Sequence, residues 1–331
     1  MTPLQLPAVV LLGTGGTIAA TAALSTTLAD YSVTEGVESL LSAVPEISTL
    51  ARLRCRQVFN VDSRSITNKM LLKLAAVVNK EAANPEVDGI VITHGTDTLE
   101  ETAWFLNLTI KSRKPVVMVG AMRPGTALSA DGPLNLYNAV LLAAHAQASG
   151  HGVMVLLNDQ ISAARFVSKT NTTQVDAFRS ADHGYLGQAH NGTIQIFQSP
   201  MRFHTAATDF SMAGVSALPE VDIVYDHQNA PLHFYEACIA AGSKGIVVAC
   251  TGNGSLSPNA RKGVRLARKN GIYCVRSSRV GSGTVSGSRD DKKDGLVTAD
   301  SLNPQKARIL LMLALTATSK LERIQWYFDN Y

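Results

Sequence analysis

Cysteine is scarce in this chain, with only four among 331 residues. The four stand far apart, at Cys55, Cys238, Cys250 and Cys274, and none forms the CxxC pair that is typical of a structural zinc site. Cys250 and Cys274 lie inside apolar strand patterns, where a free cysteine behaves as a small hydrophobic residue. We therefore expect buried thiols and no metal ligand among the cysteines.

Long hydrophobic runs are also missing. The longest, within residues 309–317, is about half of the roughly 20 residues that a membrane-spanning helix needs, so we expect no integral membrane protein. Residues 1–4 lead into an apolar strand without the charged segment or cleavage site of a signal peptide. Two locations fit this beginning: the cytoplasm, or the periplasm if a signal peptide was removed and a methionine added.

Charge and aromatic residues are modest, at 17% and 6%, and the net charge of +4 is spread along the chain. The tightest basic cluster, at residues 261–269, has the spacing of the exposed face of one helix. A nucleic-acid surface would need a denser basic stripe with interleaved aromatic residues, so we expect no nucleic-acid partner. The 46% of apolar residues is enough for a substantial core.

Short β-branched runs alternate with helical patterns, which is typical of a parallel sheet covered by helices. We expect strands at 8–12, 57–61, 89–93, 115–119 and 152–157, and helices at 66–79, 99–110 and 133–147. These elements predict a large N-terminal α/β domain over residues 1–195, with a doubly wound, mainly parallel sheet.

A second, smaller alternation follows a looser stretch that suits a strand or two and then a linker, placed at residues 196–220. Strands are expected at 221–225, 245–250 and 271–276, and helices at 231–241, 258–270 and 304–317. This pattern predicts a flavodoxin-like or Rossmann-like α/β domain over residues 221–331. Two domains also suit the length, since single cores stop growing at roughly 250–300 residues.

The loop after the first strand, residues 13–18, is rich in glycine and carries the hydroxyls of Thr14 and Thr17. Open parallel sheets bind ligands at the carboxyl ends of their strands, so this loop is a candidate site. It is not a dinucleotide loop, because Ile18 stands where the third glycine belongs, and the Walker spacing fails too. A tight turn capped by threonine explains the motif equally well.

The loop after the third strand, residues 93–101, contains a second hydroxyl. Thr98 and Glu101 fit a capping box, which would explain part of the segment by helix structure alone. Thr96 and Asp97 are left over, and they stand beside a small glycine that would let a ligand approach the main chain. Helix-start amides could bind a carboxylate or an oxyanion here, while Asp97 binds an ammonium. We expect His94 to be a packed core histidine without a chemical role.

Two further segments offer polar groups. Lys169 stands among hydroxyl and amide side chains; a solvated lysine is the simplest interpretation, but a lysine drawn into a site can take a proton from a hydroxyl. Residues 62–65 follow the second strand and could clamp a substrate. Without a G-x-S-x-G or H-E-x-x-H motif, a hydroxyl nucleophile helped by lysine is the best route to acyl transfer, although spacing alone does not favour it over a binding protein.

Residues 13–19 and 93–98 resemble the two signature motifs of bacterial L-asparaginases. The resemblance continues through segments 115–124, 129–137, 169–173 and 302–308, and it is strongest to the type II enzymes, which include the glutaminase-asparaginases. It implies hydrolysis of L-asparagine to aspartate and ammonia, with L-glutamine as a second substrate, without metal or cofactor. Comparable activity on both amino acids is the alternative.

The resemblance implies a role for each matching residue. Thr17 would be the nucleophile that forms an acyl-enzyme, assisted by Tyr31 on a lid over residues 19–35. Thr96, hydrogen-bonded towards Lys169, would activate the water, and its N–H would help form the oxyanion hole. The substrate would be bound by Asp97 at its ammonium, by Ser63 at its α-carboxylate, and along the main chain of Gly16 and Gly95.

The family also implies a homotetramer, a dimer of intimate dimers, in which the C-terminal domain of a neighbouring subunit completes each site. Asn253 matches the position that reaches across. An acidic residue on the loop 281–294 should also contact the ammonium, and Asp290 and Asp291 are the candidates.

Arg64 and Ser112 depart from the family pattern. Arg64 stands where relatives carry Gln or Glu near the ammonium, and a cation there repels the substrate unless its guanidinium turns towards the carboxylate or solvent. Ser112 replaces a cysteine of the disulfide that some type II relatives contain.

Two other functions stay open at this point. One is a non-catalytic amino-acid-binding protein on the same α/β plan, which would release no ammonia from asparagine. The other is a nucleotide-binding oxidoreductase, for which a cofactor absorbance should copurify with the protein.

Overall fold

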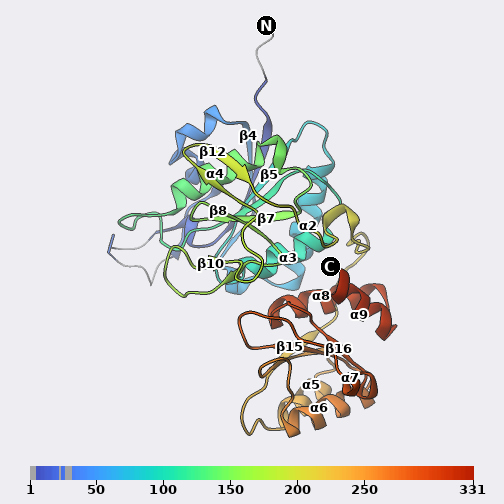
Figure 1. Ribbon diagram of the computed structural model, residues 1–331. Helices are drawn as coiled ribbons and strands as arrows, with labels where there is room; N and C mark the ends of the chain where they lie inside the picture. Colours follow the sequence, from blue (N-terminus) through green and yellow to red (C-terminus); the bar gives the residue numbers. More distant parts are fainter. Residues whose placement is uncertain (1–4, 22–23, 27–31) are drawn as a thin grey trace. The chain divides into compact units, whose positions relative to one another are not determined.

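The computed structural model describes residues 5–21, 24–26 and 32–331 (Figure 1). The chain divides into two compact units, Met1–Thr208 and Asp209–Tyr331. Among the described residues, no helix is both long and apolar enough to cross a membrane.

The first unit is built on a sheet of eight strands in the order β12-β11-β8-β7-β6-β5-β1-β4. Five neighbours run parallel: β4 (Arg52–Val61), β1 (Ala8–Gly15), β5 (Gly89–Thr93), β6 (Val116–Val119) and β7 (Val153–Leu157). Three strands extend it antiparallel: β8 (Gln160–Ala163), β11 (Gly187–His190) and β12 (Thr193–Ile196). Two short pairs lie outside it: β2 (Ala20–Thr21) with β3 (Ser32–Val33), and β9 (Ser168–Lys169) with β10 (Phe178–Arg179).

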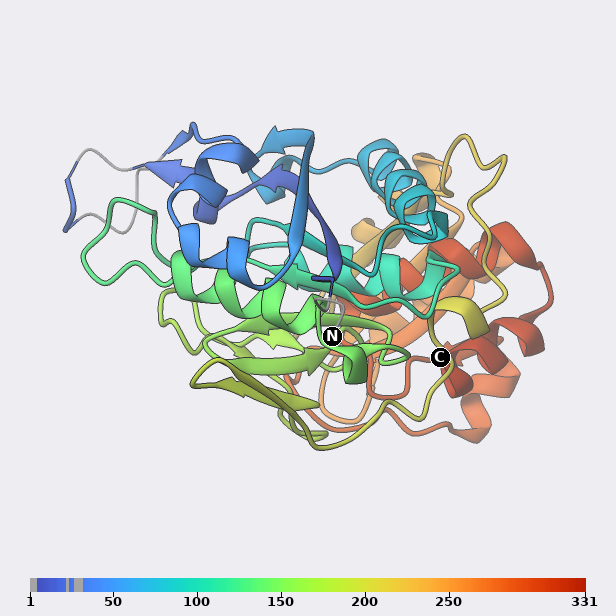
Figure 2. The same cartoon turned by 90° about the horizontal axis from the view of Figure 1, so that it is seen from above.

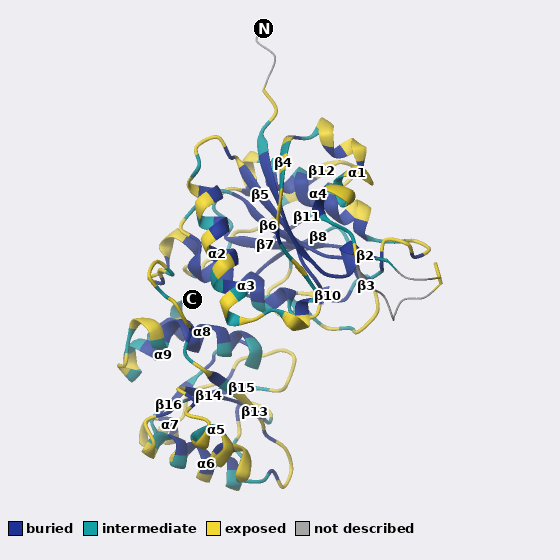
Figure 3. Ribbon diagram, turned by 180° about the vertical axis from the view of Figure 1, so that it is seen from behind, coloured by how far each residue is buried: buried dark blue, intermediate teal, exposed yellow. Residues whose placement is uncertain are grey.

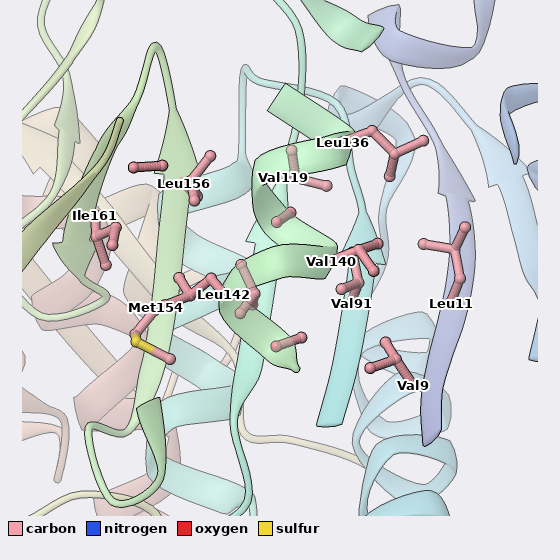
Figure 4. Close-up of a cluster of buried hydrophobic side chains, with 14 of the residues drawn as sticks. Val9, Leu11, Val91, Val119, Leu136, Val140, Leu142, Met154, Leu156 and Ile161 are labelled. Carbon is pink, nitrogen blue, oxygen red and sulfur yellow. The ribbon is translucent and has the colours of Figure 1, made fainter. Parts of the chain in front are cut away.

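Helices cover both faces of this sheet, as expected for a doubly wound fold. On one face, α4 (Gly132–Ala143) packs with α1 (Val37–Ser42) over the cluster that contains Val9, Leu11 and Val91 (Figure 4). The intervening strand residues, such as Val10 and Ile90, point to the opposite face and are also buried. Helices α2 (Asn68–Ala83) and α3 (Leu99–Thr109) cover that face (Figure 2).

One connection has an uncommon hand. The crossovers β4-α2-β5, β5-α3-β6 and β6-α4-β7 all advance in the same direction across the sheet, yet α4 lies on the face opposite α2 and α3. The α4 crossover therefore has the opposite hand to the other two, and about 98% of such connections share one hand.

The strand order locates the ligand edge. Strand β1 pairs with β4 on one side and β5 on the other, so the chain reverses its direction of progress across the sheet between β1 and β5. Ligands of open α/β sheets bind outside the carboxyl ends at such a switch point. The loops that follow β1 and β5 are the two threonine-bearing segments of the sequence.

The second unit is a smaller α/β structure, as the sequence predicts. Its four parallel strands lie in chain order: β13 (Val221–Tyr225), β14 (Gly245–Cys250), β15 (Tyr273–Ser278) and β16 (Leu296–Thr298). Helices α5 (His233–Ala240) and α6 (Pro258–Lys269) cover one face, and α8 (Pro304–Ala317) and α9 (Leu321–Asn330) cover the other (Figure 3). The short helix α7 (Arg289–Asp294) connects β15 to β16.

The last residue closes the second unit. Tyr331 is fully buried, and its ring contacts Phe210 and Tyr327. Its hydroxyl oxygen accepts a hydrogen bond from the backbone N–H of Asp209 at 2.8 Å. The two ends of this unit therefore hold each other in place.

Candidate active site

The two glycine loops touch each other through their main chains. A Cβ built on Gly16 would lie 2.2 Å from both Cα and N of Gly95, which is closer than real side chains approach. Gly16 also has φ 87° and ψ −179°, a conformation that is essentially restricted to glycine. The residues that follow them, Thr17 and Thr96, are therefore carried by loops in direct contact.

A third loop joins this contact. A Cβ on Gly95 would lie 2.8 Å from the Oγ of Ser63, which begins a 3-10 turn after β4. The hydroxyl of Thr98 donates to the backbone carbonyl of Ser63 at 2.9 Å. The capping box predicted for Thr98 and Glu101 is therefore wrong: Thr98 is the N-cap residue of α3, but its side chain makes no capping bond and holds the Ser63 loop instead.

The two threonines are shielded from bulk water. Thr17 is 4% exposed at the start of a short 3-10 turn, Thr17–Ala19, and Thr96 is 5% exposed. Below them, the hydroxyl of Thr14 donates to the carbonyl of Thr93 at 2.6 Å and ties β1 to β5. The hydroxyl of Thr14 therefore has a structural role.

Lys169 enters the site from β9. Its Nζ lies 3.0 Å from Oγ1 of Thr96 and 2.6 Å from Oδ1 of Asp97. Its side chain is only 16% exposed, so it is not the solvated lysine of the simplest interpretation, whereas the side chain of Asp97 remains 58% exposed. The Lys169 amino group therefore lies within direct hydrogen-bond reach of both a hydroxyl and a carboxylate.

A second hydrogen bond holds strand β9, and the sequence analysis did not predict it. The hydroxyl of Ser168 donates to Oε2 of Glu100 at 2.7 Å, and Glu100 is buried in the first turn of α3. Ser168 and Lys169 therefore bond neighbouring residues of one segment: Lys169 bonds Thr96 and Asp97, and Ser168 bonds Glu100. No residue spacing could predict this, because the partners are 68 positions apart.

His94 has the structural role expected of it. It is fully buried, and Nδ1 lies 2.7 Å from the carbonyl oxygen of Gly95, to which it donates when neutral. Burial lowers the pKa of His94 to about 4, because an apolar environment disfavours the charged ring. The imidazole is therefore neutral at physiological pH, and it holds the Gly95 loop through this hydrogen bond.

The side chain of Arg64 is mostly exposed and pairs within its own turn. Its side chain is 78% exposed, and Nε lies 3.2 Å from Oδ2 of Asp62, the N-cap residue of the same turn. The guanidinium charge is thus directed to solvent and to a neighbouring carboxylate. Tyr31 lies outside the described residues, as does part of the segment 19–35.

The remaining predicted residues belong to the second unit. Asn253 is exposed in the loop after β14, and its side-chain amide bonds Ser286. Asp291 is buried and pairs with Arg276, while the more exposed Asp290 bonds Arg261 at 3.0 Å.

Comparison with known protein families decides the family of the chain. The model of the asparaginase N-terminal domain matches residues 8–202, and that of the glutaminase/asparaginase C-terminal domain matches residues 220–328. The chain belongs to the asparaginase family. It is 51% identical over 328 residues to "L-asparaginase 2" of Bacillus subtilis, covering 99% of this chain and 87% of that protein.

Other asparaginase-family relatives carry two kinds of name. The "glutaminase-asparaginase" of Acinetobacter glutaminasificans is 48% identical, with 98% of this chain and 99% of that protein covered. The crystal structure of a "probable cytoplasmic L-asparaginase" from Campylobacter jejuni has a TM-score of 0.96 and 46% identity, covering 98% and 100% of the two chains. A Haemophilus influenzae relative, 44% identical over 99% of this chain and 94% of its own length, is named periplasmic. Asparaginases similar to this chain thus occur under names for both compartments.

Proposed function

We propose that this protein hydrolyses the side-chain amide of L-asparagine to L-aspartate and ammonia, and that it also accepts L-glutamine. The main-chain contact between Gly16 and Gly95 supports this most directly, because it brings two hydroxyl-bearing loops together at the ligand edge of the sheet. The names of the relatives support the same reaction.

The first step is attack by Thr17. Its Oγ forms a bond to the amide carbon of the substrate, the C–N bond breaks, and ammonia leaves with the hydroxyl proton. The backbone N–H of Thr96 is proposed to bind the oxyanion, a contact worth about 10²- to 10³-fold in rate. The contact of His94 with the Gly95 carbonyl supports this role. That carbonyl and the N–H of Thr96 belong to the same planar peptide group, so holding one fixes the direction of the other.

The second step is hydrolysis of the acyl-enzyme. The water oxygen bonds the acyl carbon and gives a proton to Oγ1 of Thr96, whose own hydroxyl proton passes to the Lys169 amine. The bond between the acyl carbon and Oγ of Thr17 breaks, and the proton held by the lysine returns to that Oγ. The 3.0 Å contact between Nζ and Oγ1 supports this proton path. The two steps require hydroxyls, one lysine and water, and the proposal assigns no metal or cofactor.

The substrate is proposed to bind through its charged ends. Asp97 binds the ammonium, and Ser63 with nearby main-chain amides binds the α-carboxylate. The exposure of Asp97 and the contact between Ser63 and Gly95 support these roles. Arg64 is directed to solvent, and its charge is proposed not to repel the substrate ammonium. Tyr31 is proposed to assist Thr17.

A homotetramer, assembled as a dimer of intimate dimers, is proposed to complete each site. Residues 221–331 of a neighbouring copy would supply Asn253 and an acidic residue. Between the two candidates Asp290 suits this role better, because both oxygens of Asp291 accept hydrogen bonds from Arg276 at 2.6 Å within its own unit.

Substitution of each threonine tests the mechanism. Thr17→Val and Thr96→Val should each lower ammonia release by at least about 10³-fold while the thermal midpoint stays near that of the parent. Thr109→Val is the matched control, since that hydroxyl donates only within α3, to the Phe105 carbonyl at 2.8 Å. Near-normal turnover by either site variant would reject the assignment, and a parent protein that binds asparagine without releasing ammonia would support a binding protein instead.

Steady-state kinetics on both amino acids decide the substrate. A kcat/KM for asparagine well above that for glutamine would support an asparaginase. Comparable values would support the alternative, a glutaminase-asparaginase, as the Acinetobacter relative is named. For the compartment, we propose the periplasm if a signal peptide precedes this chain in the cell and the cytoplasm otherwise; fractionation of the native host tests it.

A further inference from the structure

Arg276 is a buried arginine of the second unit that the proposed chemistry does not use. It lies on β15 and is 6% exposed. Its Nε and Nη2 donate to the two oxygens of Asp291, each at 2.6 Å. This bidentate pair is well shielded from water, since the side chains are only 7% and 9% exposed.

The same guanidinium holds two loops at the carboxyl end of the second sheet. Nη1 donates to the carbonyl of Gly254 at 2.5 Å, and Nη2 donates to the carbonyl of Ser286 at 2.9 Å. One planar group therefore ties helix α7, through Asp291, to the loops at 251–255 and 286. A lysine could not reproduce this, because its ammonium lacks the flat fork that reaches a carboxylate and two carbonyls at once.

Asn253 belongs to the first of these loops and bonds the second. Its Oδ1 accepts from the N–H of Ser286 at 2.7 Å, and its Nδ2 donates to the Ser286 hydroxyl at 3.2 Å. An asparagine amide has two N–H hydrogens and two acceptor lone pairs, so Ser286 uses half of each and the exposed amide keeps capacity for a ligand. The position of this amide is thus set by the loops that Arg276 holds.

We infer that Arg276 is a positioning residue for substrate binding, which acts by holding Asn253 in the orientation that a neighbouring copy's site requires. This inference rests on the proposed function and deepens it. It also gives Asp291 a role different from the one that the sequence suggested: its carboxylate orients the arginine instead of contacting the substrate.

A double-mutant cycle on the full-length, assembled protein tests the inference. Arg276→Lys and Asn253→Ala should each raise KM for asparagine by about five- to tenfold, the effect of losing roughly one positioned hydrogen bond, with kcat changed less than about threefold. In the double variant the KM should rise no further, because Arg276 acts through Asn253. Arg265→Lys is the matched control: its guanidinium also pairs with a carboxylate of α7, Asp294 at 2.8 Å, but holds neither loop.

Two further measurements keep the test decisive. If Arg276→Lys does not fold, the variant Ser286→Ala replaces it, since this surface change removes only the contact of the Ser286 Oγ with Asn253. Ser286→Ala should raise KM about twofold in the parent protein and leave KM unchanged in the Asn253→Ala background. Amide hydrogen exchange at residues 251–255 should become faster in Arg276→Lys and stay unchanged in Arg265→Lys, whether or not the protein hydrolyses asparagine.

The outcomes are separable. Multiplicative KM effects in the double variant, or unchanged exchange of the loop, would overturn the role of Arg276 while leaving the proposed function intact. A parent protein without ammonia release would overturn the proposed function, and the exchange result would then still decide whether Arg276 holds the Asn253 loop.

Discussion

A single methyl group on Gly16 should disable the site without unfolding the protein. Alanine at this position would place Cβ 2.2 Å from Cα and N of Gly95 and 2.8 Å from the carbonyl carbon of His94. All three atoms belong to the main chain, so no side chain can rotate away. The loops that carry Thr17 and Thr96 must separate by about 1 Å, and a displacement of that size can cost roughly 10²-fold in rate.

The backbone adds a second penalty. The φ of 87° and ψ of −179° lie in a region that costs a residue with a side chain about 1–3 kcal/mol. We therefore expect Gly16→Ala to lower kcat/KM for asparagine by roughly 10²-fold and the free energy of unfolding by about 1–3 kcal/mol. Coupled detection of ammonia and urea unfolding followed by circular dichroism measure the two effects.

Gly36→Ala is the matched control for this prediction. A Cβ there would meet nothing nearer than 3.8 Å, and φ of −87° suits any residue. Both activity and stability should stay close to the parent values. If Gly16→Ala retained kcat/KM within about twofold while folded, the close approach of the two loops would not set the catalytic geometry, and the reasoning from the 2.2 Å contact would be refuted.

Three other residues give independent predictions. The pKa of His94 is about 4 in the folded protein and 6.5 ordinarily. As the pH falls from 6.5 to 4, the unfolded chain therefore binds a proton that the folded protein excludes. The free energy of unfolding should drop by up to about 3 kcal/mol over this range. Urea unfolding at several pH values should show a smaller drop in His94→Gln, and an identical pH profile would contradict the buried neutral ring. Arg64→Gln should change KM for asparagine and glutamine by less than about threefold, because the guanidinium is 78% exposed and directed to Asp62; a larger decrease in KM would show that its charge reaches the ammonium. Tyr331→Ala should lower the free energy of unfolding of the second unit by about 3–5 kcal/mol, since a fully buried ring is lost. Tyr225 is 58% exposed, so Tyr225→Ala should lower the same free energy by less than about 0.5 kcal/mol.

The parallel core of the first unit was predictable because its strands are wholly apolar. β5 occupies the predicted residues 89–93, and β6 and β7 each begin one residue later than expected. Strand β4 begins at Arg52, five residues before the predicted start, because its first half alternates arginine with apolar or small residues. This alternation is typical of a sheet edge, where charged side chains face water, and a search for continuous apolar runs misses it.

At the antiparallel end of the sheet only a strand or two was expected, so β8 and β11 were missed although their turns have a sequence signal. Asn191 and Gly192 join β11 to β12 with φ of 47° and 70°, as in the two-residue turn that favours Asn-Gly. Asn158 and Asp159 join β7 to β8 in the same way, with φ of 49° and 63°. Local turn chemistry, in addition to hydrophobic runs, would have predicted both hairpins.

The site was predictable only in part. The strand order explains why the Thr17 and Thr96 loops are neighbours, and the position after each strand was enough to select them. The contact of Lys169 with Thr96 was expected only from the family resemblance. The bond of Ser168 to Glu100 was not predictable, because nothing local relates β9 to the first turn of α3. The hydroxyl of Thr98 shows the same limit: the capping-box spacing is present, but a tertiary contact with Ser63 takes the hydroxyl.

The place of β1 between β4 and β5 has a consequence for how the site forms. The strand emerges first during synthesis, but both of its partners are made later, β4 from residue 52 and β5 from residue 89. Until β5 pairs with β1, the Thr17 loop lacks its contact with the Gly95 loop, and Lys169 is synthesised later still. If Thr17, Thr96 and Lys169 act as we propose, a chain that ends before residue 169 lacks part of the site and should not hydrolyse asparagine.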